Sequence, residues 1–465
     1  LQKTLRKYQR DGYRWLRTLD GYGMGGILAD DMGLGKTVQV LSYLLAMKQN
    51  GQTLPSLIVC PASLVLNWAE ECQKFTPELS CVVVDGDAAH RAELAESWPA
   101  ADLVVTSYDL LRRDEALYEG QEFYACILDE AQAIKNHTTQ KYKAVCKVRS
   151  RVRFALTGTP VENRLGELWS IFSFLMPGYL PPYKSFCSRF EKPIVQEEDQ
   201  TAVRRLNQLT GPFILRRMKS DVLKELPPKT ENVYRIELEE EQRKLYLAAV
   251  VDAREKLQAA KPEDKMAVFA VLMRLREICC DPRLIADNWE GGSAKLDACA
   301  ELVSSAVEGG HRILLFSQFT SMLELLAKRL DAEGISHFTL QGSTPKPVRA
   351  ELVRRFNGGE VSVFLISLRA GGTGLNLTAA DIVIHYDPWW NVAAQNQATD
   401  RAYRIGQQNP VQVYKLIAQD TIEEKIVELQ QAKQSLADTV TGTADGAILS
   451  MRPDELLQLL EGSEP

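Results

Sequence analysis

Short apolar runs alternate with helix-length amphipathic segments along the first third of the chain. This pattern predicts strands at 27–29, 57–60, 82–85, 103–106, 125–128 and 153–156, with helices such as 38–48 and 64–75 between them. Alternation of strands with helices is typical of a parallel, doubly wound sheet. Ligands of such sheets bind at the carboxyl ends of the strands, so the chemistry is expected there.

The alternation stops between residues 165 and 296 and then resumes. The middle region is interrupted by prolines and predicts helices at 167–176, 200–209, 239–257 and 265–279. Beyond it the pattern predicts strands at 313–316, 337–340, 361–366, 382–386 and 411–417, and then an amphipathic helical tail at 421–436 and 454–460. We interpret the chain as two α/β domains with helical insertions and a linker.

The domain boundaries follow from these changes of pattern. We expect a first lobe over residues 1–225, with a helical insertion at about 165–215. We expect a second lobe over residues 226–465, with an insertion at about 236–290 and a C-terminal helical brace at about 421–465.

Composition places the chain among ordinary globular proteins. Of its 465 residues, 45% are hydrophobic and 25% are charged, which supports more than one core. The net charge of −6 excludes an overall basic footprint, so any nucleic-acid contact must be local. The most basic stretch, 204–229, holds seven Lys or Arg residues. It is either a solvated helix face or a surface that faces phosphate or couples the lobes.

The cysteines, the apolar runs and the first residue of the chain indicate where the protein works and where it comes from. Nine cysteines occur without a CxxC pair, which favours reduced, structural thiols in an intracellular protein. No apolar run approaches the roughly 18 residues of a membrane span, and we find no signal peptide. The chain begins at Leu1 without Met, which indicates an excised domain or a processed fragment. Its Ala-rich insertions indicate a prokaryotic origin.

The segment DDMGLGKT at 30–37 is the first candidate site. An apolar run precedes it and a helix-like run follows, so unpaired helix N–H groups would point at an anion. Gly33 and Gly35 allow the backbone to bend around phosphates, Lys36 would reach the β and γ phosphates, and the Thr37 hydroxyl would hold Mg²⁺. A strict phosphate loop begins with Gly, whereas this one has Asp30. The alternative is a Gly-rich turn with a surface lysine.

Acidic and hydroxyl residues follow two later strands. In LDEAQ at 128–132, Asp129 would bind Mg²⁺ through water, and Glu130 would orient and deprotonate the attacking water. In LTGTP at 156–160, small hydroxyl residues could relay the state of the γ-phosphate. Gly and Pro equally explain that motif as a strand-ending turn.

The second half supplies a Gly-rich loop at 367–377 and two arginines. Arg401 and Arg404 are three residues apart, a spacing that predicts one helix face. An arginine delivered from a second domain can neutralise the γ-phosphate in the transition state. A surface arginine pair is the alternative.

Together the motifs resemble the Swi/Snf family of DNA translocases. In order, the chain reads LRKYQRDGYRWL, ILADDMGLGKT, IVCPASLVLNW, ILDEAQAIKN, ALTGTPVENRLGELWSIFSFL, ILRRMKSDVLKELPPK, ILLFSQFT, SLRAGGTGLNLTAADIVIHYDPWWN and QATDRAYRIGQ. The resemblance spans residues 5 to about 425, and Asp30 is usual in that family. It implies two RecA-like lobes with ATP in the cleft, double-stranded DNA bound across both, and a prokaryotic member or excised catalytic core.

The resemblance also implies roles for individual residues. Gln9 would read the adenine edge, helped by Arg6, and Gly374 would lie near the nucleotide. The loop residues Asp31, Met32, Gly33, Leu34, Gly35, Lys36 and Thr37 would hold the phosphates and metal, and Arg401 and Arg404 would supply the arginine fingers. Contacts to DNA would come from Pro61, Ser63, Asn67, Thr106, Ser107, Gln318, Gln341, Gly342, Ser343, Thr344, Arg369, Gly371, Gly372 and Trp390. For Trp390 and its neighbour Trp389 the alternative is plain core packing.

We therefore expect a monomeric, DNA-stimulated ATPase that uses ATP and Mg²⁺ and moves along duplex DNA without separating its strands. DNA-bound proteins such as a polymerase, a recombinase or a nucleosome are further expected partners, and no membrane is expected. The location would be the nucleoid region of the cytoplasm in a prokaryote, or the nucleus in a eukaryote. A strand-separating DNA or RNA helicase and an ATPase that remodels a protein complex remain the alternatives.

Overall fold

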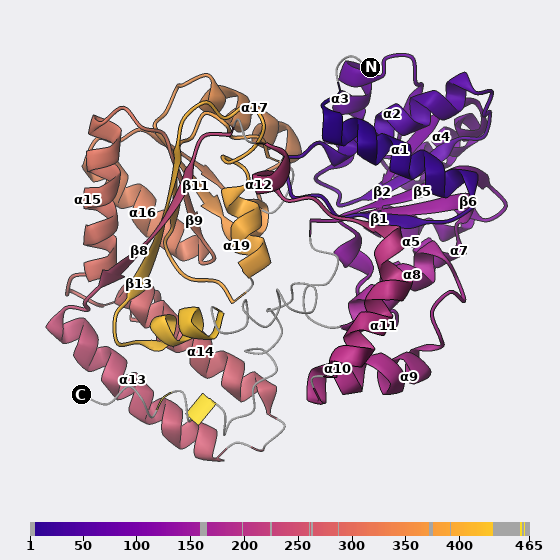
Figure 1. Ribbon diagram of the computed structural model, residues 1–465. Helices are drawn as coiled ribbons and strands as arrows, with labels where there is room; N and C mark the ends of the chain where they lie inside the picture. The colour runs from indigo at the N-terminus through magenta and orange to yellow at the C-terminus, as the bar shows by residue number, and fades with distance from the viewer. Residues whose placement is uncertain are drawn as a thin grey trace. The chain divides into compact units, whose positions relative to one another are not determined.

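The chain forms two compact units, Leu1–Lys224 and a second that starts at Glu225 (Figure 1). The structure is a computed structural model that describes residues 5–158, 165–197, 199–223, 226–259, 261, 264–286, 288–371, 375–390, 392–430, 456–457 and 460. Each unit is built on one sheet, and every strand pair within both sheets is parallel. No helix in the described part of the chain is long and apolar enough to cross a membrane.

The sheet of unit 1 has seven strands in the order β3-β4-β2-β5-β6-β1-β7. Their bounds are β1 Gly26–Leu28, β2 Ser56–Cys60, β3 Cys81–Val83, β4 Leu103–Ser107, β5 Glu122–Asp129, β6 Arg149–Leu156 and β7 Ile214–Leu215. The central strands are buried on both faces, which explains why they read as continuous apolar runs. This burial made them predictable from the sequence.

Helices connect these strands and then continue into the predicted insertion. Helix α1, Lys7–Gly21, precedes β1, and the helices that follow between strands are α2 Lys36–Gln49, α3 Val65–Phe75, α4 Ala88–Ser97, α5 Tyr108–Arg113, α6 Glu115–Tyr118 and α7 Gln140–Lys147. The later helices are α8 Leu165–Leu175, α9 Tyr183–Phe186, α10 Lys192–Gln196, α11 Gln200–Thr210 and α12 Lys219–Val222. The chain re-enters the sheet between α11 and α12, because β7 pairs with β1.

The sheet of unit 2 has six strands in the order β10-β11-β9-β12-β13-β8. Their bounds are β8 Lys229–Ile236, β9 Ile313–Ser317, β10 His337–Leu340, β11 Val363–Ser367, β12 Ile382–His385 and β13 Val411–Ala418. The helices are α13 Glu240–Ala259, α14 Lys265–Cys280, α15 Ala294–Glu308, α16 Thr320–Ala332, α17 Lys346–Asn357, α18 Leu368–Gly371 and α19 Val392–Thr399, followed by a helical segment at 422–430.

Alternation of side chains along β9 places helices on both faces of this sheet. Ile313 and Leu315 pack in one core cluster with residues of α15 and α16, whereas Leu314 and Phe316 pack in another with residues of α17 and α19. Figure 1 shows these helices on opposite sides of the sheet. The predicted fold class, two parallel-sheet α/β lobes with helical insertions, is confirmed.

Candidate functional site

The phosphate loop lies between β1 and α2. Gly33 and Gly35 have φ angles of +81° and +79°, in the left-handed region that favours glycine. A Cβ atom at Gly35 would lie 2.6 Å from Nε2 of Gln9. Gly35 is also the N-cap of α2 and supplies no side-chain cap, so the first N–H groups of the helix remain open to an anion. Asp31, Met32 and Thr37 are partly exposed, whereas Leu34 is buried.

The ammonium group of Lys36 lies within this loop. Its Nζ donates to the carbonyl oxygens of Asp30 at 2.5 Å and Asp31 at 3.4 Å. Lys36 is the first residue of α2, so its positive charge stands beside the positive end of the helix dipole. This arrangement is chemically suited to the phosphates of a nucleotide.

The start of α1 contacts the same loop. Gln9 Nε2 donates to the carbonyl of Leu34 at 3.0 Å, and the Tyr8 hydroxyl donates to the same oxygen at 2.9 Å. The backbone N–H of Arg6 donates to Gln9 Oε1 at 2.9 Å. Both the nitrogen and the oxygen of the Gln9 amide are therefore hydrogen-bonded, which fixes the orientation of this side chain beside the loop. Its contact with adenine, and that of Arg6, stay predictions.

Asp30, the residue that departs from a strict phosphate loop, is fully buried and ion-paired. Both of its carboxylate oxygens accept from the guanidinium of Arg217, with Nε at 2.8 Å from Oδ1. Gln39 Nε2 donates to Asp30 Oδ2 at 3.1 Å, and Gln39 Oε1 accepts from Arg217 Nη2 at 2.7 Å. At the position where a strict phosphate loop has glycine, this chain therefore has a carboxylate that is held in place by charged and polar partners.

This ion pair explains two further positions. A Cβ atom at Gly12 in α1 would collide with Gln39 Oε1 and would lie 2.7 Å from Arg217 Nη2. The backbone N–H of Lys219 donates to Asp31 Oδ2 at 2.9 Å, and Lys219 itself is buried. Part of the basic stretch at 204–229 therefore faces the carboxylates of the phosphate loop. No local sequence motif marks Arg217 for this role, because its partner Asp30 lies 187 residues earlier in the chain.

The acidic pair stands at the end of β5, two strands from β1 in the sheet. Asp129 Oδ1 accepts from the backbone N–H of Glu130 at 2.9 Å, and Oδ2 accepts from Trp68 Nε1 at 2.8 Å. Tyr108 donates its hydroxyl to the carbonyl of Asp129 at 2.9 Å. Glu130 has a φ of +50°, a strained backbone for a non-glycine residue and a frequent feature of functional sites.

Burial raises the pKa of Asp129, and the charge of Glu130 adds to this effect, so that the pKa reaches about 7 even though Trp68 and Lys36 lower it. A carboxylate whose negative charge is poorly solvated gains most from a bound cation. This electrostatic setting suits a metal ligand.

The motif at 156–160 is joined to the acidic pair by side chains. Gln132 Nε2 donates to Glu130 Oε2 at 2.7 Å, and the Thr157 hydroxyl donates to Gln132 Oε1 at 3.0 Å. Thr159 and Pro160 lie outside the described residues. The contact between Thr157 and Gln132 is compatible with the predicted relay, and Gln132 is a participant that the sequence analysis had not named.

No group of three or more His, Cys, Asp or Glu side chains within the described ranges could hold a metal. A magnesium ion commonly binds one or two protein oxygens together with the phosphates of a nucleotide. The hydroxyl of Thr37 and the carboxylate of Asp129 are hard oxygen donors of this kind. The donor chemistry of unit 1 therefore fits Mg²⁺ bound together with a nucleotide.

The residues of unit 1 predicted to contact DNA fall into two segments. Pro61 and Ser63 lie between β2 and α3, Asn67 lies in the first turn of α3, and all three are partly exposed. Thr106 and Ser107 end β4 with buried hydroxyls: Thr106 Oγ1 accepts from Tyr118 at 3.0 Å, and Ser107 Oγ accepts from the N–H of Leu110 at 3.2 Å. Both residues also pair with Val59 and Cys60 of β2, so they are held inside the sheet and their contact with DNA stays a prediction.

In unit 2, Gln318 follows β9, and its backbone N–H donates to Asp387 at 3.2 Å. The predicted loop at 341–344 is fixed by Arg349, which donates to the carbonyls of Thr344 at 2.8 Å and Gly342 at 2.8 Å. Gly342 and Ser343 are exposed. Arg369 and Gly371 belong to α18, and Gly372 and Gly374 lie outside the described residues.

Trp390 does not have the exposed position expected of an aromatic DNA contact. Its side chain is 3% exposed and belongs to the core cluster of α13 and α14. The guanidinium carbon of Arg276 lies 4.3 Å from the centroid of its ring. In this structure Trp390 is a packing residue that covers a buried cation, and its contact with DNA stays a prediction.

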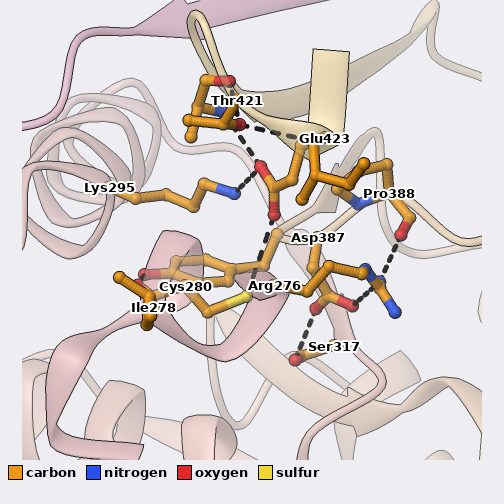
Figure 2. A network of polar contacts seen from close by, with 12 residues as sticks. Arg276, Ile278, Cys280, Lys295, Ser317, Asp387, Pro388, Thr421 and Glu423 are labelled. Carbon is orange, nitrogen blue, oxygen red and sulfur yellow. Dashed lines mark hydrogen bonds and ion pairs between the residues drawn. The ribbon is translucent and has the colours of Figure 1, made fainter. Parts of the chain in front are cut away.

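Arg276 belongs to a buried network that joins α14 to the ends of β9 and β12 (Figure 2). Arg276 Nη2 lies 3.4 Å from Asp387 Oδ2 and also donates to the carbonyl of Pro388, and Ser317 donates to Asp387 Oδ1 at 2.6 Å. A second pair, Lys295 and Glu423, is also fully buried. Charges are rarely buried unless they are paired, so these pairs fix the insertion and the segment at 422–430 on unit 2.

Arg401 and Arg404 do not share a helix face, which corrects that prediction. Helix α19 ends at Thr399, and both arginines lie in the turns that follow. Arg401 is 3% exposed, and its carbonyl accepts from the N–H of Leu377 at 3.1 Å. Arg404 Nη1 donates to the carbonyl of Leu375 at 3.5 Å. The turns bring both residues beside Leu375 and Leu377, at the C-terminal end of the Gly-rich loop.

A parallel sheet with a phosphate loop at one strand end and an acidic pair at another defines the class of P-loop nucleoside triphosphatases. The model of the SNF2-related domain family matches residues 8–284, and that of the helicase conserved C-terminal domain matches residues 294–406. The chain belongs to the SNF2-related family. The resemblance stated from the motifs is confirmed.

Individual relatives agree with this assignment. An uncharacterised ATP-dependent helicase of Mycoplasma genitalium is 40% identical over 98% of this chain and 44% of its own length. YwqA of Bacillus subtilis, which its name assigns to ATP-dependent helicases or translocases, is 40% identical over 98% of this chain and 50% of its own length. The chain thus spans half or less of these curated relatives.

Two further relatives are a eukaryotic factor and a solved structure. The TATA-binding protein-associated factor MOT1 of Saccharomyces cerevisiae is 34% identical over 99% of this chain and 29% of its own length. The SWI2/SNF2 ATPase core of Sulfolobus solfataricus in complex with dsDNA is 36% identical over 97% of this chain and 96% of that chain, with a TM-score of 0.49. The family assignment depends on sequence and not on this superposition.

Proposed function

We propose that the protein is an ATP-dependent translocase on double-stranded DNA, which moves along the duplex without separating its strands and displaces or remodels bound proteins. The observation that carries the proposal is the set of contacts around Lys36, Asp129 and Glu130 on one parallel sheet, in a member of the SNF2-related family. These contacts fix the positions of one cation and two carboxylates, which is what phosphoryl transfer requires.

Each site residue of unit 1 has a defined role in the proposed hydrolysis. The N–H groups of the loop and the Lys36 ammonium bind the phosphates, and Gln9 contacts the base. Thr37 and Asp129 would hold Mg²⁺, which would neutralise charge on the phosphates. Glu130 orients the attacking water and takes its proton, and Gln132 holds the carboxylate of Glu130 through Oε2.

Unit 2 supplies the two arginines in this proposal. Arg401 and Arg404 neutralise the charge that develops on the γ-phosphate, so turnover depends on closure of the two units in each cycle. DNA phosphates are gripped by the segments at 61–67 and 106–107 in unit 1, and by 318, 341–344 and 369–372 in unit 2. Such contacts are electrostatic and independent of sequence, so binding falls steeply as salt rises.

The test is the ATPase rate measured in parallel with duplex DNA, single strands, RNA and nucleosomes. We expect stimulation by duplex DNA that is abolished in Lys36→Ala and Glu130→Gln. The matched controls are Lys147→Ala and Glu93→Gln, whose side chains are exposed and lie on the surface of unit 1. Unchanged stimulation in either site variant contradicts the proposal.

Two further assays separate the alternatives. Displacement of a triplex-forming strand without unwinding of a forked duplex supports translocation, whereas unwinding identifies a strand-separating helicase. An ATPase rate that ignores duplex DNA but responds to a DNA-bound protein identifies a remodeller of protein complexes. The name of the relative MOT1, a TATA-binding protein-associated factor, makes the TATA-binding protein on DNA one suitable substrate for that assay.

A further inference from the structure

Two aromatic side chains hold Asp129 from different elements of unit 1. Trp68, in α3, donates its indole N–H to the carboxylate oxygen Oδ2 at 2.8 Å. Tyr108, at the start of α5, donates its hydroxyl to the carbonyl oxygen of the same residue at 2.9 Å. The other carboxylate oxygen accepts from the N–H of Glu130. These three contacts fix both the rotamer of Asp129 and the end of β5.

Each of the two aromatic residues directly follows a segment to which the proposed function assigns DNA contact. Trp68 comes after Asn67 in the segment at 61–67, and Tyr108 comes after Ser107 in the segment at 106–107. The connection is short and hydrogen-bonded, because the N–H of Leu64 donates to Pro61 at 2.8 Å and the N–H of Trp68 donates to Leu64 at 3.0 Å. One turn of helix therefore separates the partly exposed loop from the indole.

The burial of both rings makes this connection stiff. Trp68 is 0% exposed and Tyr108 is 3% exposed, and both belong to the core cluster of unit 1. A close-packed interior does not let such rings turn independently of their backbone. A displacement of the segment at 61–67 or 106–107 therefore changes the position of a donor at Asp129.

We propose that Trp68 and Tyr108 are positioning residues that link the proposed DNA-contacting segments to the metal-binding carboxylate of Asp129. DNA that binds and displaces these segments moves the two donors, and the donors set the orientation of the carboxylate that hydrolysis needs. This inference rests on the proposed function, and it gives a physical route by which duplex DNA raises the rate of ATP hydrolysis. Partners of this kind around a metal ligand typically change metal affinity 10- to 100-fold.

The chain offers a matched control for each donor. Trp98 is also 0% exposed in unit 1 and packs against Tyr118 and Phe123, but its Nε1 has no hydrogen-bond partner among the described residues. Trp68→Phe and Trp98→Phe therefore remove the same atoms from a core, and only the first removes a donor from Asp129. Tyr142→Phe, which loses a contact of 2.9 Å with Ser173, is the control for Tyr108→Phe.

The first measurement contains no DNA. The affinity of a fluorescent ADP analogue is measured with Mg²⁺ and with EDTA, after thermal unfolding has shown that the variants are folded. We expect Trp68→Phe to reduce the gain in affinity that Mg²⁺ provides by about tenfold, and Trp98→Phe to leave that gain unchanged. Equal gains in the two variants overturn the proposal.

The second measurement is the factor by which duplex DNA stimulates ATP hydrolysis. We expect Trp68→Phe and Tyr108→Phe to lower this factor at least about fivefold relative to Trp98→Phe and Tyr142→Phe. A basal and a stimulated rate that fall by the same factor overturn the link to DNA and with it the proposal. A wild-type protein without stimulation by DNA contradicts the proposed function instead, and the Mg²⁺ measurement still decides whether Trp68 positions Asp129.

Discussion

Arg217 and Asp30 form an ion pair between residues that are 187 positions apart in the chain, and this pair fixes the first residue of the phosphate loop. The carboxylate is fully buried and the guanidinium side chain is 13% exposed. Asp30 therefore stabilises the conformation of the loop, whereas Lys36 is the loop residue proposed to bind the phosphates. The basic stretch at 204–229 thus contacts the phosphate loop through the ion pair between Arg217 and the carboxylate of Asp30.

Replacing Asp30 by Ala should destabilise unit 1 by about 3–5 kcal/mol, because it leaves the charge of Arg217 without its buried partner. The free energy of unfolding in urea provides the measurement. Asp11→Ala is the control, since Asp11 forms a 3.6 Å pair with Arg14 in which both side chains are exposed, and such pairs contribute at most about 1 kcal/mol. Similar losses in the two variants would refute the structural role of Asp30.

The double variant Arg401→Ala, Arg404→Ala should retain nucleotide affinity and lose about a thousandfold or more in turnover, as expected for arginines that act only in the transition state. Binding of a fluorescent nucleotide and the ATPase rate separate the two effects. Arg354→Ala, at an exposed position, is the control. Because Arg401 is buried, circular dichroism should verify that the double variant is folded. Loss of nucleotide binding in a folded variant would exclude the assignment.

Replacing Lys295 by Met should destabilise unit 2 by about 3–5 kcal/mol, because Glu423 remains buried and charged. The double variant Lys295→Met, Glu423→Gln should recover most of this loss, since the amide oxygen can still accept from the N–H of Ala418. A double-mutant cycle of unfolding free energies measures the coupling. Lys244→Met, at an exposed lysine, should change little. Additive losses in the cycle would show that the pair is not coupled.

His385 should make unit 2 less stable as the pH falls. Burial lowers the pKa of its imidazole to about 3, an effect to which Lys415 adds, and Nε2 lies 2.9 Å from Thr399 Oγ1. The unfolded chain takes up a proton near pH 6.5 while the folded protein stays neutral, so stability present above pH 6.5 is lost progressively towards pH 3. The slope approaches about 1.4 kcal/mol per pH unit. His385→Gln should remove this part of the slope between pH 7 and pH 5, and an unchanged slope would contradict the prediction.

Sequence periodicity predicted the strands that are marked by an apolar run and missed the two that are not. The strand at 337–340 has the predicted bounds, and β5 begins only three residues before its prediction. β7 was missed because two residues, Ile214 and Leu215, carry no period. β8 was missed because seven of its eight residues are exposed or half-exposed at the edge of its sheet, so no apolar run marks it.

In the candidate site, too, residues of contiguous motifs were easier to predict than residues that come together only in the fold. The residues of the phosphate loop and the acidic pair were predictable because each motif is contiguous. Arg217, Trp68 and Gln132 were not, because their roles come from contacts that the fold creates, across 61 residues in the case of Trp68 and Asp129. The helical spacing of Arg401 and Arg404 was misleading, since α19 ends before both residues.

The crowding at Gly12 has a consequence for the evolution of the family. Any side chain at position 12 would meet Gln39 and Arg217, whose own contacts hold the carboxylate of Asp30. A lineage that replaces Gly12 must therefore change Gln39 or Arg217 as well. Substitutions at positions 12, 39 and 217 should therefore occur together among homologues, although the three residues lie in α1, in α2 and near the end of unit 1.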